Sequence, residues 1–393
     1  RASYPSLMRR LLRVLRNTVI VLVALAVLLT GFLRFVHYPN PIATIKLGLA
    51  PASKTPTLMP WHTIDPSANP IAWPTSTEAT PETVAWKGKQ IKWQDFLDRT
   101  NTNAFLLVRN GVITYEYYKT GFSESSQLPS YSVAKTMTSI IAGQLIAQGK
   151  LKESDTFIKY FPELKTGTSF DRVTVQSLLD MQSGVGVSDN YPTGPAGWGV
   201  AIAQMYATTD IDWFMKNNRK MAFEPGSKSE YRSVDTQMLG MIIKAITGIT
   251  IAEYFSENVW KPIGAKYPAT WNVDRVGGTE KTFCCFNATA RDYARVGLAV
   301  INGGQAGAKQ IIDPVWLKRM TTPVTKLDHN WGYSAFVWHP VPGISQAEGL
   351  HGQYIFMNPK TRTVIVKLSD NPTGLDETVA TAKVLLGVSN KLN

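Results

Sequence analysis

The stretch "PSYSVAKTMTSI", residues 129–140, decides how the rest of this sequence is interpreted. It places Ser132 three residues before Lys135, at the front of an apolar run that is typical of a helix. On a helix, this spacing puts both side chains on one face, one turn apart. A serine hydroxyl needs a base to become a nucleophile, and a lysine whose pKa is lowered by burial can supply it. The alternative is a helix cap followed by a surface lysine, and the spacing alone fits both.

The composition is that of a globular protein, and its charge is unevenly distributed. Of the 393 residues, 18% are charged and 44% are hydrophobic, and the formal net charge is +12. Most of that excess lies before Asp65, because no acidic residue precedes it. The remainder is mildly basic and contains no zinc-finger spacing or phosphate-binding glycine loop, so we predict no nucleic-acid partner. The five histidines show no metal-ligand spacing, and we predict neither a metal nor a cofactor.

Residues 18–36, "TVIVLVALAVLLTGFLRFV", are almost wholly apolar. At about 1.5 Å per residue they span roughly 28 Å, close to the thickness of a bilayer core. The basic residues within 1–17 predict a cytoplasmic N-terminus, so we expect a single-pass anchor in the inner (cell) membrane with the remaining chain on the periplasmic side. A cleaved signal peptide and a buried core helix are the alternatives. The Ala24–Ala26 triplet lies in the middle of the run, where a cleavage site would not be.

Residues 37–87 contain nine prolines, which lie between positions 39 and 81. So many prolines disfavour a helix or a central strand. We therefore predict an extended linker, which could wrap the following domain through Trp61, Trp73 and Trp86.

The only two cysteines are neighbours, Cys284 and Cys285. A disulfide between neighbours is strained and rare, so two small buried residues are the simpler interpretation. A chain of this length needs no disulfide framework.

Residues 88–393 have strand-like segments at both ends and helix-like segments between them. Near the start, "AFLLVRNGVITYEYY" contains two β-rich runs joined by Asn110-Gly111, a strong hairpin signal. Helical patterns such as "TQMLGMIIKAI" and "ARDYARVGLAVI" fill the middle. Near the end, "GQYIFMNP" and "TVIVKLSD" alternate like antiparallel strands, and a last helical pattern follows. The order predicts an α/β (α+β) fold, in which one antiparallel sheet is built from both ends, with flanking helices and an inserted helical subdomain.

A second motif gives the serine–lysine pair its context. The segment "MAFEPGSKSEYRSVDTQMLG", from Met221, carries Tyr231-Arg232-Ser233 after a Pro-Gly turn. Together with the first motif, it resembles the serine β-lactamase and penicillin-binding-protein superfamily, whose Tyr-x-Asn element it matches with Ser233 in place of asparagine. The resemblance covers roughly residues 90–388. "SGVGVSDNY" and "EGLHGQYIF" are most similar to the 6-aminohexanoate-dimer hydrolase and carboxylesterase branch.

This resemblance implies a role for each candidate residue and a β-lactamase/transpeptidase-like fold. Tyr231 would carry protons beside Lys135, and the backbone N–H groups of Ser132 and Leu350 would form an oxyanion hole. Tyr191 would donate a hydrogen bond to the substrate, which we expect to be a small molecule or short oligomer with a linear amide or ester bond. Two further residues are expected beside the substrate, Gly349 as a point of close approach and His351 as a wall of the cleft.

Other motifs leave alternatives open. Ser188-Asp189-Asn190 and Lys165-Thr166-Gly167 spell motifs of class A β-lactamases, but their order is wrong. The position expected for the second of them holds Ala347-Glu348-Gly349, whose missing lysine argues against a site for a β-lactam carboxylate. The aromatic residues from Trp331 to Trp338 are either a rim of the cleft or the core of an edge strand. A β-lactamase or D-Ala-D-Ala carboxypeptidase of the same fold, and a non-catalytic binding domain, are the competing functions.

Overall fold

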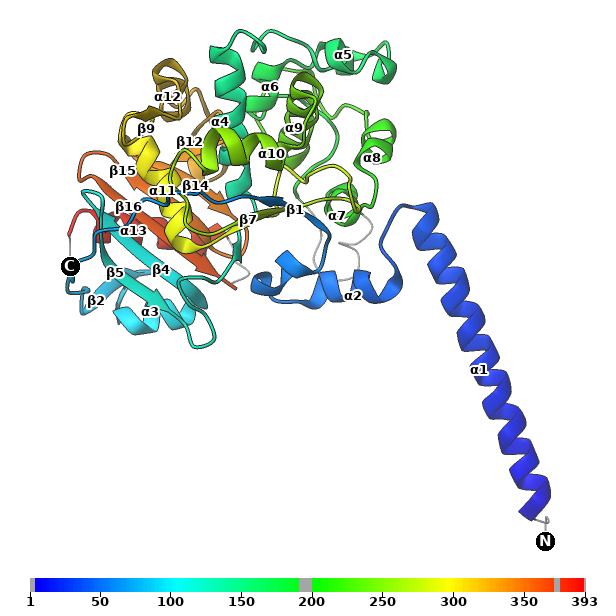
Figure 1. Ribbon diagram of the computed structural model, residues 1–393. Coiled ribbons are helices and arrows are strands. Elements are labelled where there is room, and N and C mark those ends of the chain that lie inside the picture. The colour runs from blue at the N-terminus through cyan, green and yellow to red at the C-terminus, as the bar shows by residue number, and fades with distance from the viewer. Residues whose placement is uncertain (1–3, 191–199, 371–374, 392–393) are drawn as a thin grey trace.

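The protein consists of a mixed α/β body and a long N-terminal helix that extends away from it (Figure 1). The computed structural model describes residues 4–190, 200–370 and 375–391. The extended helix, α1, runs over Tyr4–Phe35 and has an exposed apolar surface.

An eight-stranded antiparallel sheet forms the centre of the body, in the order β11-β12-β13-β14-β15-β16-β4-β5. Its N-terminal part is the hairpin β4 (Thr102–Arg109) and β5 (Val112–Tyr118), which pairs through β4 with the last strand, β16 (Thr363–Ser369). Asn110 and Gly111 both have positive φ, as the hairpin signal requires. The prediction of one sheet built from both ends of the domain is therefore confirmed. The remaining strands are β11 (Thr325–Lys326), β12 (Gly332–Ser334), β13 (Val337–His339), β14 (Ser345–Gly349) and β15 (Gln353–Asn358).

Helices cover both faces of this sheet. Because successive side chains of a strand point to opposite faces, each strand contributes residues to a core on each side of the sheet. In β15, Tyr354 and Phe356 lie under α13 (Leu375–Ser389) and α3 (Trp93–Arg99), whereas Ile355 and Met357 lie on the opposite face. That second face carries α11 (Ala290–Ile301) and α4 (Val133–Ala147).

The helical region expected in the middle of the domain lies beside the sheet (Figure 1). It is accompanied by a four-stranded antiparallel sheet in the order β1-β7-β8-β6. The bounds of this sheet are β1 (Trp61–Ile64), β7 (Ala269–Asn272), β8 (Phe286–Ala288) and β6 (Leu128–Pro129). The helices are α5 (Phe157–Tyr160), α6 (Val175–Leu179), α7 (Ala201–Ala207), α8 (Ile211–Asn217), α9 (Ser233–Thr247), α10 (Ile251–Phe255) and α12 (Pro314–Thr321). Short elements complete the body: η1 (Ala52–Thr57), η2 (Pro162–Leu164), η3 (Ser169–Arg172), η5 (Ser256–Trp260), η6 (Asp328–Asn330), and the pairs β2 (Thr83–Trp86) with β3 (Lys89–Lys92) and β9 (Gln305–Ala306) with β10 (Lys309–Gln310).

The prediction that residues 37–87 hold no helix is wrong, because α2 (Pro41–Leu49) lies there. Its proline occupies the first turn, where the missing N–H removes no intrahelical hydrogen bond. The Asn40 side chain caps the helix by accepting a hydrogen bond from Ala43 N–H at 2.9 Å. Strand β1, also in this segment, lies at the edge of its sheet, where flanking prolines are tolerated.

The rest of this segment lies along the body. Ile71 N–H donates to Gly264 O at 3.1 Å, and the guanidinium of Arg295 lies 4.8 Å from the centre of the Trp73 ring. Trp86 is buried, whereas Trp61 is about half exposed. Trp73 and Trp86 therefore attach the segment to the domain, and Trp61 contributes little.

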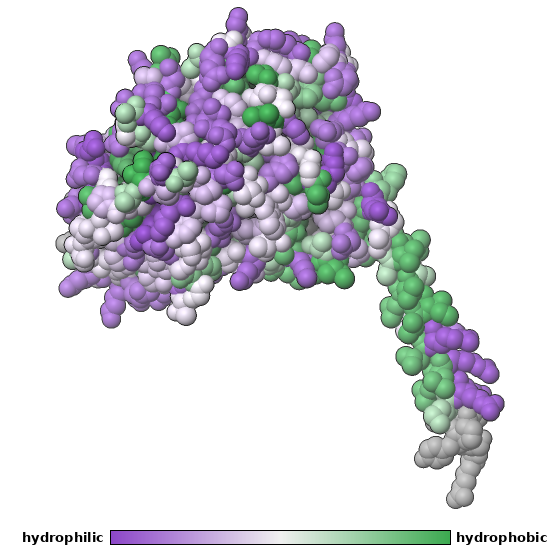
Figure 2. All heavy atoms as spheres, viewed as in Figure 1, coloured by the Kyte–Doolittle hydropathy of each residue, from purple (hydrophilic) through white to green (hydrophobic). Residues whose placement is uncertain are grey.

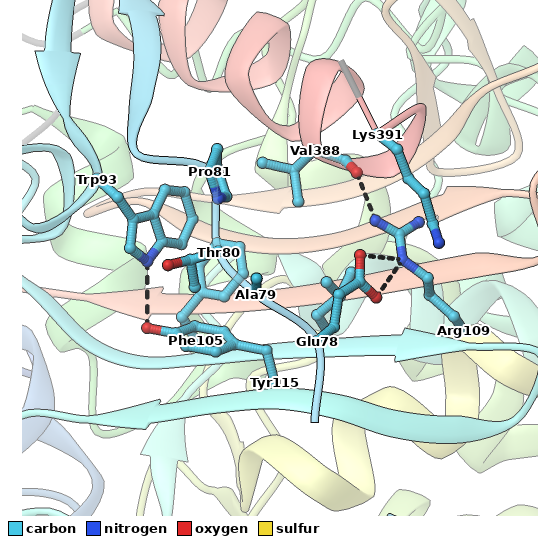
Figure 3. Close-up of a pocket in the computed structure, with 11 residues that line it drawn as sticks. Glu78, Ala79, Thr80, Pro81, Trp93, Phe105, Arg109, Tyr115, Val388 and Lys391 are labelled. Carbon is cyan, nitrogen blue, oxygen red and sulfur yellow. Dashed lines mark hydrogen bonds and ion pairs between the residues drawn. The ribbon is translucent and has the colours of Figure 1, made fainter. Parts of the chain in front are cut away.

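Arg109 joins four parts of the chain beside a cavity of about 190 Å³ (Figure 3). Its Nε donates to both carboxylate oxygens of Glu78, at 2.7 and 2.9 Å. The other two nitrogens reach the C-terminal carbonyls of α13, Val388 O at 2.7 Å and Ser389 O at 2.9 Å, and the hydroxyl of Thr363 at 3.0 Å. A cation at this position also interacts favourably with the C-terminal end of the helix dipole.

We expect Arg109→Met to lower the free energy of unfolding by about 3 kcal/mol, because it leaves a carboxylate and two helix-terminal carbonyls without their donor. Urea unfolding in detergent, followed by tryptophan fluorescence, measures the change. The matched control is Arg172→Met, which removes an exposed ion pair with Glu224 and should leave the midpoint unchanged. Equal midpoints for the two variants would contradict this role of Arg109.

Candidate active site

Ser132 lies at the N-terminal end of α4, directly after a strained turn. Tyr131, the residue before it, has a φ of 44°, a left-handed conformation that costs energy in a residue other than glycine. Ser130 N–H donates to Phe286 O at 2.8 Å, which fixes the turn to strand β8. The serine hydroxyl therefore sits at the positive end of a buried helix, where developing negative charge is favoured.

Lys135 is buried one turn further along α4, with 1% of its surface exposed. Its Nζ lies 2.8 Å from Ser132 Oγ, 3.0 Å from Ser233 Oγ and 2.9 Å from the carbonyl oxygen of Phe283. Burial lowers the pKa of this amine to about 8, against the opposing effect of Asp189 and Asp235. An amine with this pKa is partly neutral near physiological pH and can accept the proton of Ser132.

Tyr231 lies beside this pair, just before α9. Lys135 Nζ lies 5.0 Å from the centre of its ring, and the Ser132 side chain is close enough to oppose the rise that burial causes in the pKa of the Tyr231 hydroxyl. Burial, assisted by the charge of Asp189, raises the pKa of Tyr231 well above its ordinary value, so the phenol keeps its proton. The ring stacks on Trp338 at 5.5 Å.

The aromatic segment from Trp331 to Trp338 belongs to the core, since Trp331, Tyr333 and Trp338 are all buried. Tyr333 and Trp338 contact the Tyr231 ring on its edge and its face. The segment therefore supports Tyr231 from a buried position and is no exposed rim.

Asp189 lies in the site, although the Ser188-Asp189-Asn190 motif was discounted because of its order in the sequence. Its carboxylate accepts hydrogen bonds from Ser233 N–H and from Ser233 Oγ, both at 2.6 Å. Because the Ser233 hydroxyl donates its proton to Asp189, its lone pairs face Lys135. The sequence held one indication of such a residue, which is Ser233 in place of the asparagine of the Tyr-x-Asn element. The Ser233 hydroxyl needs an acceptor for its proton, and Asp189 supplies it.

The Lys165-Thr166-Gly167 motif has no part in this site. The N–H groups of Thr166 and Gly167 both donate to Asp171 at 2.8 Å, which closes a local loop. Its position is consistent with its order in the sequence, which does not fit a class A β-lactamase.

The end of strand β14 packs tightly against the Ser132 turn. A side chain at Gly349 would come within 2.3 Å of Ser130 O and 3.0 Å of Ser132 N, so only glycine fits there. Within the part of the chain that the structure describes, the N–H groups of Ser132 and Leu350 donate to no protein acceptor. Two unused N–H groups thus flank the junction of α4 and β14, as an oxyanion hole requires.

His351 follows these residues and packs edge-on against Tyr131, with ring centres 4.7 Å apart. Burial lowers the pKa of His351, although the charge of Asp370 acts in the opposite direction. The lowered pKa favours the neutral ring at pH 7. Its position next to the Ser132 turn is compatible with the expectation that His351 forms a wall of the substrate cleft. Tyr191, the expected substrate donor, lies outside the described residues.

Glu348, the middle residue of Ala347-Glu348-Gly349, is directed away from α4. It pairs across the strands with Tyr354, whose ring lies in the core under α13. Gln346 Nε2 donates to its carboxylate at 2.8 Å, and burial raises its pKa to about 7. At neutral pH the residue is only partly charged, so the missing lysine matters more here than repulsion by Glu348.

Cys284 and Cys285 are joined in a disulfide directly after Phe283, the residue whose carbonyl contacts Lys135. Both are buried as expected, but the bond between them contradicts the simpler interpretation of two unpaired residues. Trp271 Nε1 donates to Cys284 O at 3.0 Å, so this turn is also fixed from outside. Among the described residues, no group of three or more potential ligands could hold a metal ion.

Two curated proteins are similar to this chain in sequence. The 6-aminohexanoate-dimer hydrolase of Paenarthrobacter ureafaciens is 28% identical over 305 residues, covering 70% of this chain and 74% of that protein. A Salmonella agona protein, provisionally described as a D-alanyl-D-alanine carboxypeptidase, is 25% identical over 228 residues, or 51% of this chain and 52% of its own.

Solved structures show the same architecture. A Bacillus anthracis protein, provisionally described as a 6-aminohexanoate-dimer hydrolase, superposes with a TM-score of 0.76 at 25% identity, over 90% of this chain and 96% of its own. A family VIII carboxylesterase shares the fold at a TM-score of 0.57 and 19% identity, over 75% and 94% of the two chains. The family model described as Beta-lactamase matches residues 94–388, which is most of the chain. The protein therefore belongs to the beta-lactamase family of serine hydrolases.

Proposed function

We propose that this protein is a membrane-anchored serine hydrolase that cleaves linear amide or ester bonds through an acyl-enzyme on Ser132. The observation that carries the proposal is the placement of Lys135. Its amine is removed from water, has a pKa of about 8 and contacts the Ser132 hydroxyl at 2.8 Å. These are the properties that a general base for a serine nucleophile needs.

The reaction begins when neutral Lys135 accepts the proton of Ser132 Oγ as this oxygen bonds to the substrate carbonyl carbon. The electron pair of the carbonyl moves to its oxygen, which the N–H groups of Ser132 and Leu350 then hold. Tyr231 donates its proton to the leaving nitrogen or oxygen as the scissile bond breaks, and it regains a proton from Lys135. Water then attacks the acyl-enzyme by the same route in reverse, which releases the acid and restores Ser132.

The substrate class rests on the similarity to the 6-aminohexanoate-dimer hydrolase and on the missing lysine. A linear amide needs a proton for its leaving nitrogen, and Tyr231 retains one. A β-lactam presents a carboxylate near the scissile bond, and Ala347-Glu348-Gly349 offers it no cation. Amides and esters that lack a carboxylate beside the scissile bond do not need a cation at this position for binding.

The anchor is α1, which is long and apolar enough to cross a membrane between Met8 and Phe35. A signal sequence would satisfy the same criterion. We propose an anchor in the inner membrane, with the hydrolase domain on the periplasmic side, on the basis of the basic residues before the span and the position of Ala24–Ala26.

Ser132, Lys135 and Tyr231 should act as one unit. Ser132→Ala, Lys135→Ala and Tyr231→Phe should each lower kcat/KM by roughly a thousandfold or more, and the double variants should cost little more than the single ones. A fluorophosphonate probe, mapped by mass spectrometry, should modify Ser132 in the native chain. Ser125→Ala, at an exposed site, is the control and should be labelled normally. Near-normal turnover in Lys135→Ala would refute the assignment of the base.

Asp189→Asn should move the acidic limb of the kcat/KM profile to lower pH. In the native chain, activity should rise as Lys135 loses its proton, with a midpoint near its pKa of about 8. The charge of Asp189 raises that pKa, so its removal lowers the midpoint. A purely structural role would reduce activity at every pH and leave the midpoint in place. Asp95→Asn, on the exposed surface of α3, is the charge-matched control.

Linear substrates should be preferred to β-lactams. With rates divided by those of uncatalysed hydrolysis, kcat/KM for 6-aminohexanoate dimer and p-nitrophenyl butyrate should exceed that for nitrocefin by about tenfold to a hundredfold. That ratio corresponds to one missing charge-assisted hydrogen bond, about 1.5–3 kcal/mol. Normalised nitrocefin turnover equal to or above that of the amide and ester would favour a β-lactamase instead. Release of D-alanine from a peptide ending in D-Ala-D-Ala, at a higher rate than either, would favour a carboxypeptidase.

A further inference from the structure

Helix α2 exposes a row of three large aliphatic side chains. Ile42, Ile45 and Leu49 are 68%, 58% and 80% exposed, whereas Leu47 is buried in the core. At roughly 100° per residue, the spacing of three and then four residues places the exposed three on one side of the helix and Leu47 on the other. One face of α2 thus packs on the domain, and the opposite face is an apolar surface in contact with no described residue that would bury it.

The position of this surface is fixed relative to the end of α1. Only residues 36–40 lie between α1 and α2, and they span at most about 17 Å even if fully extended. His37 is attached to the domain, because its ring stacks on Trp213 at 4.3 Å and its carbonyl accepts from Thr209 N–H at 2.7 Å. The exposed face of α2 therefore cannot move far from the point where α1 leaves the body.

A fourth exposed apolar residue, Val276, lies at the same edge. Val276 is 89% exposed and follows Arg275, whose guanidinium lies 3.6 Å from Asp210, the carboxylate next to His37. Figure 2 shows apolar residues on the side of the body from which α1 leaves. Lys46, also exposed, can extend its ammonium group from α2 toward lipid phosphates while its stem stays among the acyl chains.

We propose that the face of α2 formed by Ile42, Ile45 and Leu49 rests in the headgroup region of the bilayer and seats the catalytic domain on the membrane surface. The inference rests on the anchoring proposed above. The occupant is lipid because α1 brings the bilayer to this place, and because aliphatic side chains beside a lysine are the composition of interfacial helices. The described structure offers no apolar partner surface on the protein itself for this row.

The contact would also fix the candidate active site relative to the membrane. Segment η1 follows α2 directly, and its Thr55 hydroxyl contacts the hydroxyl of Tyr131, the residue before Ser132, at 3.5 Å. The backbone N–H and the hydroxyl of Ser53 donate to Asp370 at 2.6 and 2.7 Å. Through this short connection, the membrane-facing helix and the Ser132 turn belong to one rigid side of the domain.

The test measures the depth of α2 in the full chain reconstituted into phosphatidylglycerol–phosphatidylcholine vesicles. Ile45→Cys, Leu49→Cys, Leu22→Cys and Val315→Cys are each labelled with a nitroxide, while Cys284 and Cys285 stay paired and buried. Electron paramagnetic resonance then gives collision rates with oxygen, which concentrates in lipid, and with a nickel chelate, which stays in water. Val315 is the control, because it is 78% exposed on α12, at the far end of the body from α2 (Figure 1).

The ratio of oxygen to nickel collisions at positions 45 and 49 should exceed that at 315 several-fold, and the ratio at 22 should be higher still. A ratio at 45 and 49 equal to that at 315, with 22 in lipid, overturns this inference and leaves the anchor intact. A water-like ratio at 22 instead refutes the anchor itself. Protection of 45 and 49 from both reagents would show that protein, such as a second copy of the chain, covers the face, which also overturns the inference. Urea midpoints equal to that of the unlabelled chain confirm that each labelled protein is folded.

Discussion

The burial of the Lys135 amine is the constraint on which the rest of this site depends. A lysine ammonium taken out of water is costly, and the protein meets this cost partly with three acceptors and partly by a lowered pKa. Each acceptor comes from a different part of the chain: the start of α4, the start of α9 and the turn at Phe283. In the proposed mechanism, the burial that costs stability also makes Lys135 a base, because a fully solvated lysine would stay protonated and could not accept a proton from Ser132.

The surrounding fold can be understood as the means of holding these three acceptors in place. Helix α4 packs on the central sheet, and Gly349 lets the end of β14 come within contact distance of the Ser132 turn. Asp189 orients Ser233, and the disulfide between Cys284 and Cys285 follows the Phe283 carbonyl. Aromatic rings at Tyr333 and Trp338 hold Tyr231 beside the amine. Rigid support of this kind keeps reacting groups within the small tolerances that catalysis needs.

The segment after the N-terminal helix has a larger part in the fold than a linker usually has. Glu78 binds Arg109, Trp73 packs under Arg295, and η1 contacts the turn before Ser132. These contacts place the segment after α1 against both the central sheet and the candidate site. A tether that only joined an anchor to a domain would have no reason to make them.

The sequence by itself determined the features that depend on local spacing. Once residues 133–147 form a helix, the Ser-x-x-Lys interval puts Ser132 and Lys135 on one face of it. Asn110-Gly111 adopts the turn that these residues favour, and alternating apolar residues mark the strands. The order of these elements was enough to predict a sheet made from both ends. Only the tertiary structure decided the long-range partners, such as Asp189 with Ser233 across 44 residues and Phe283 with Lys135 across 148. A polar group has many candidate partners along a chain of this length, and packing selects among them. The structure also has a helix, α2, among the prolines, where Asn40 caps it and Leu47 packs on the core, and it joins Cys284 and Cys285 in a disulfide that their spacing disfavoured.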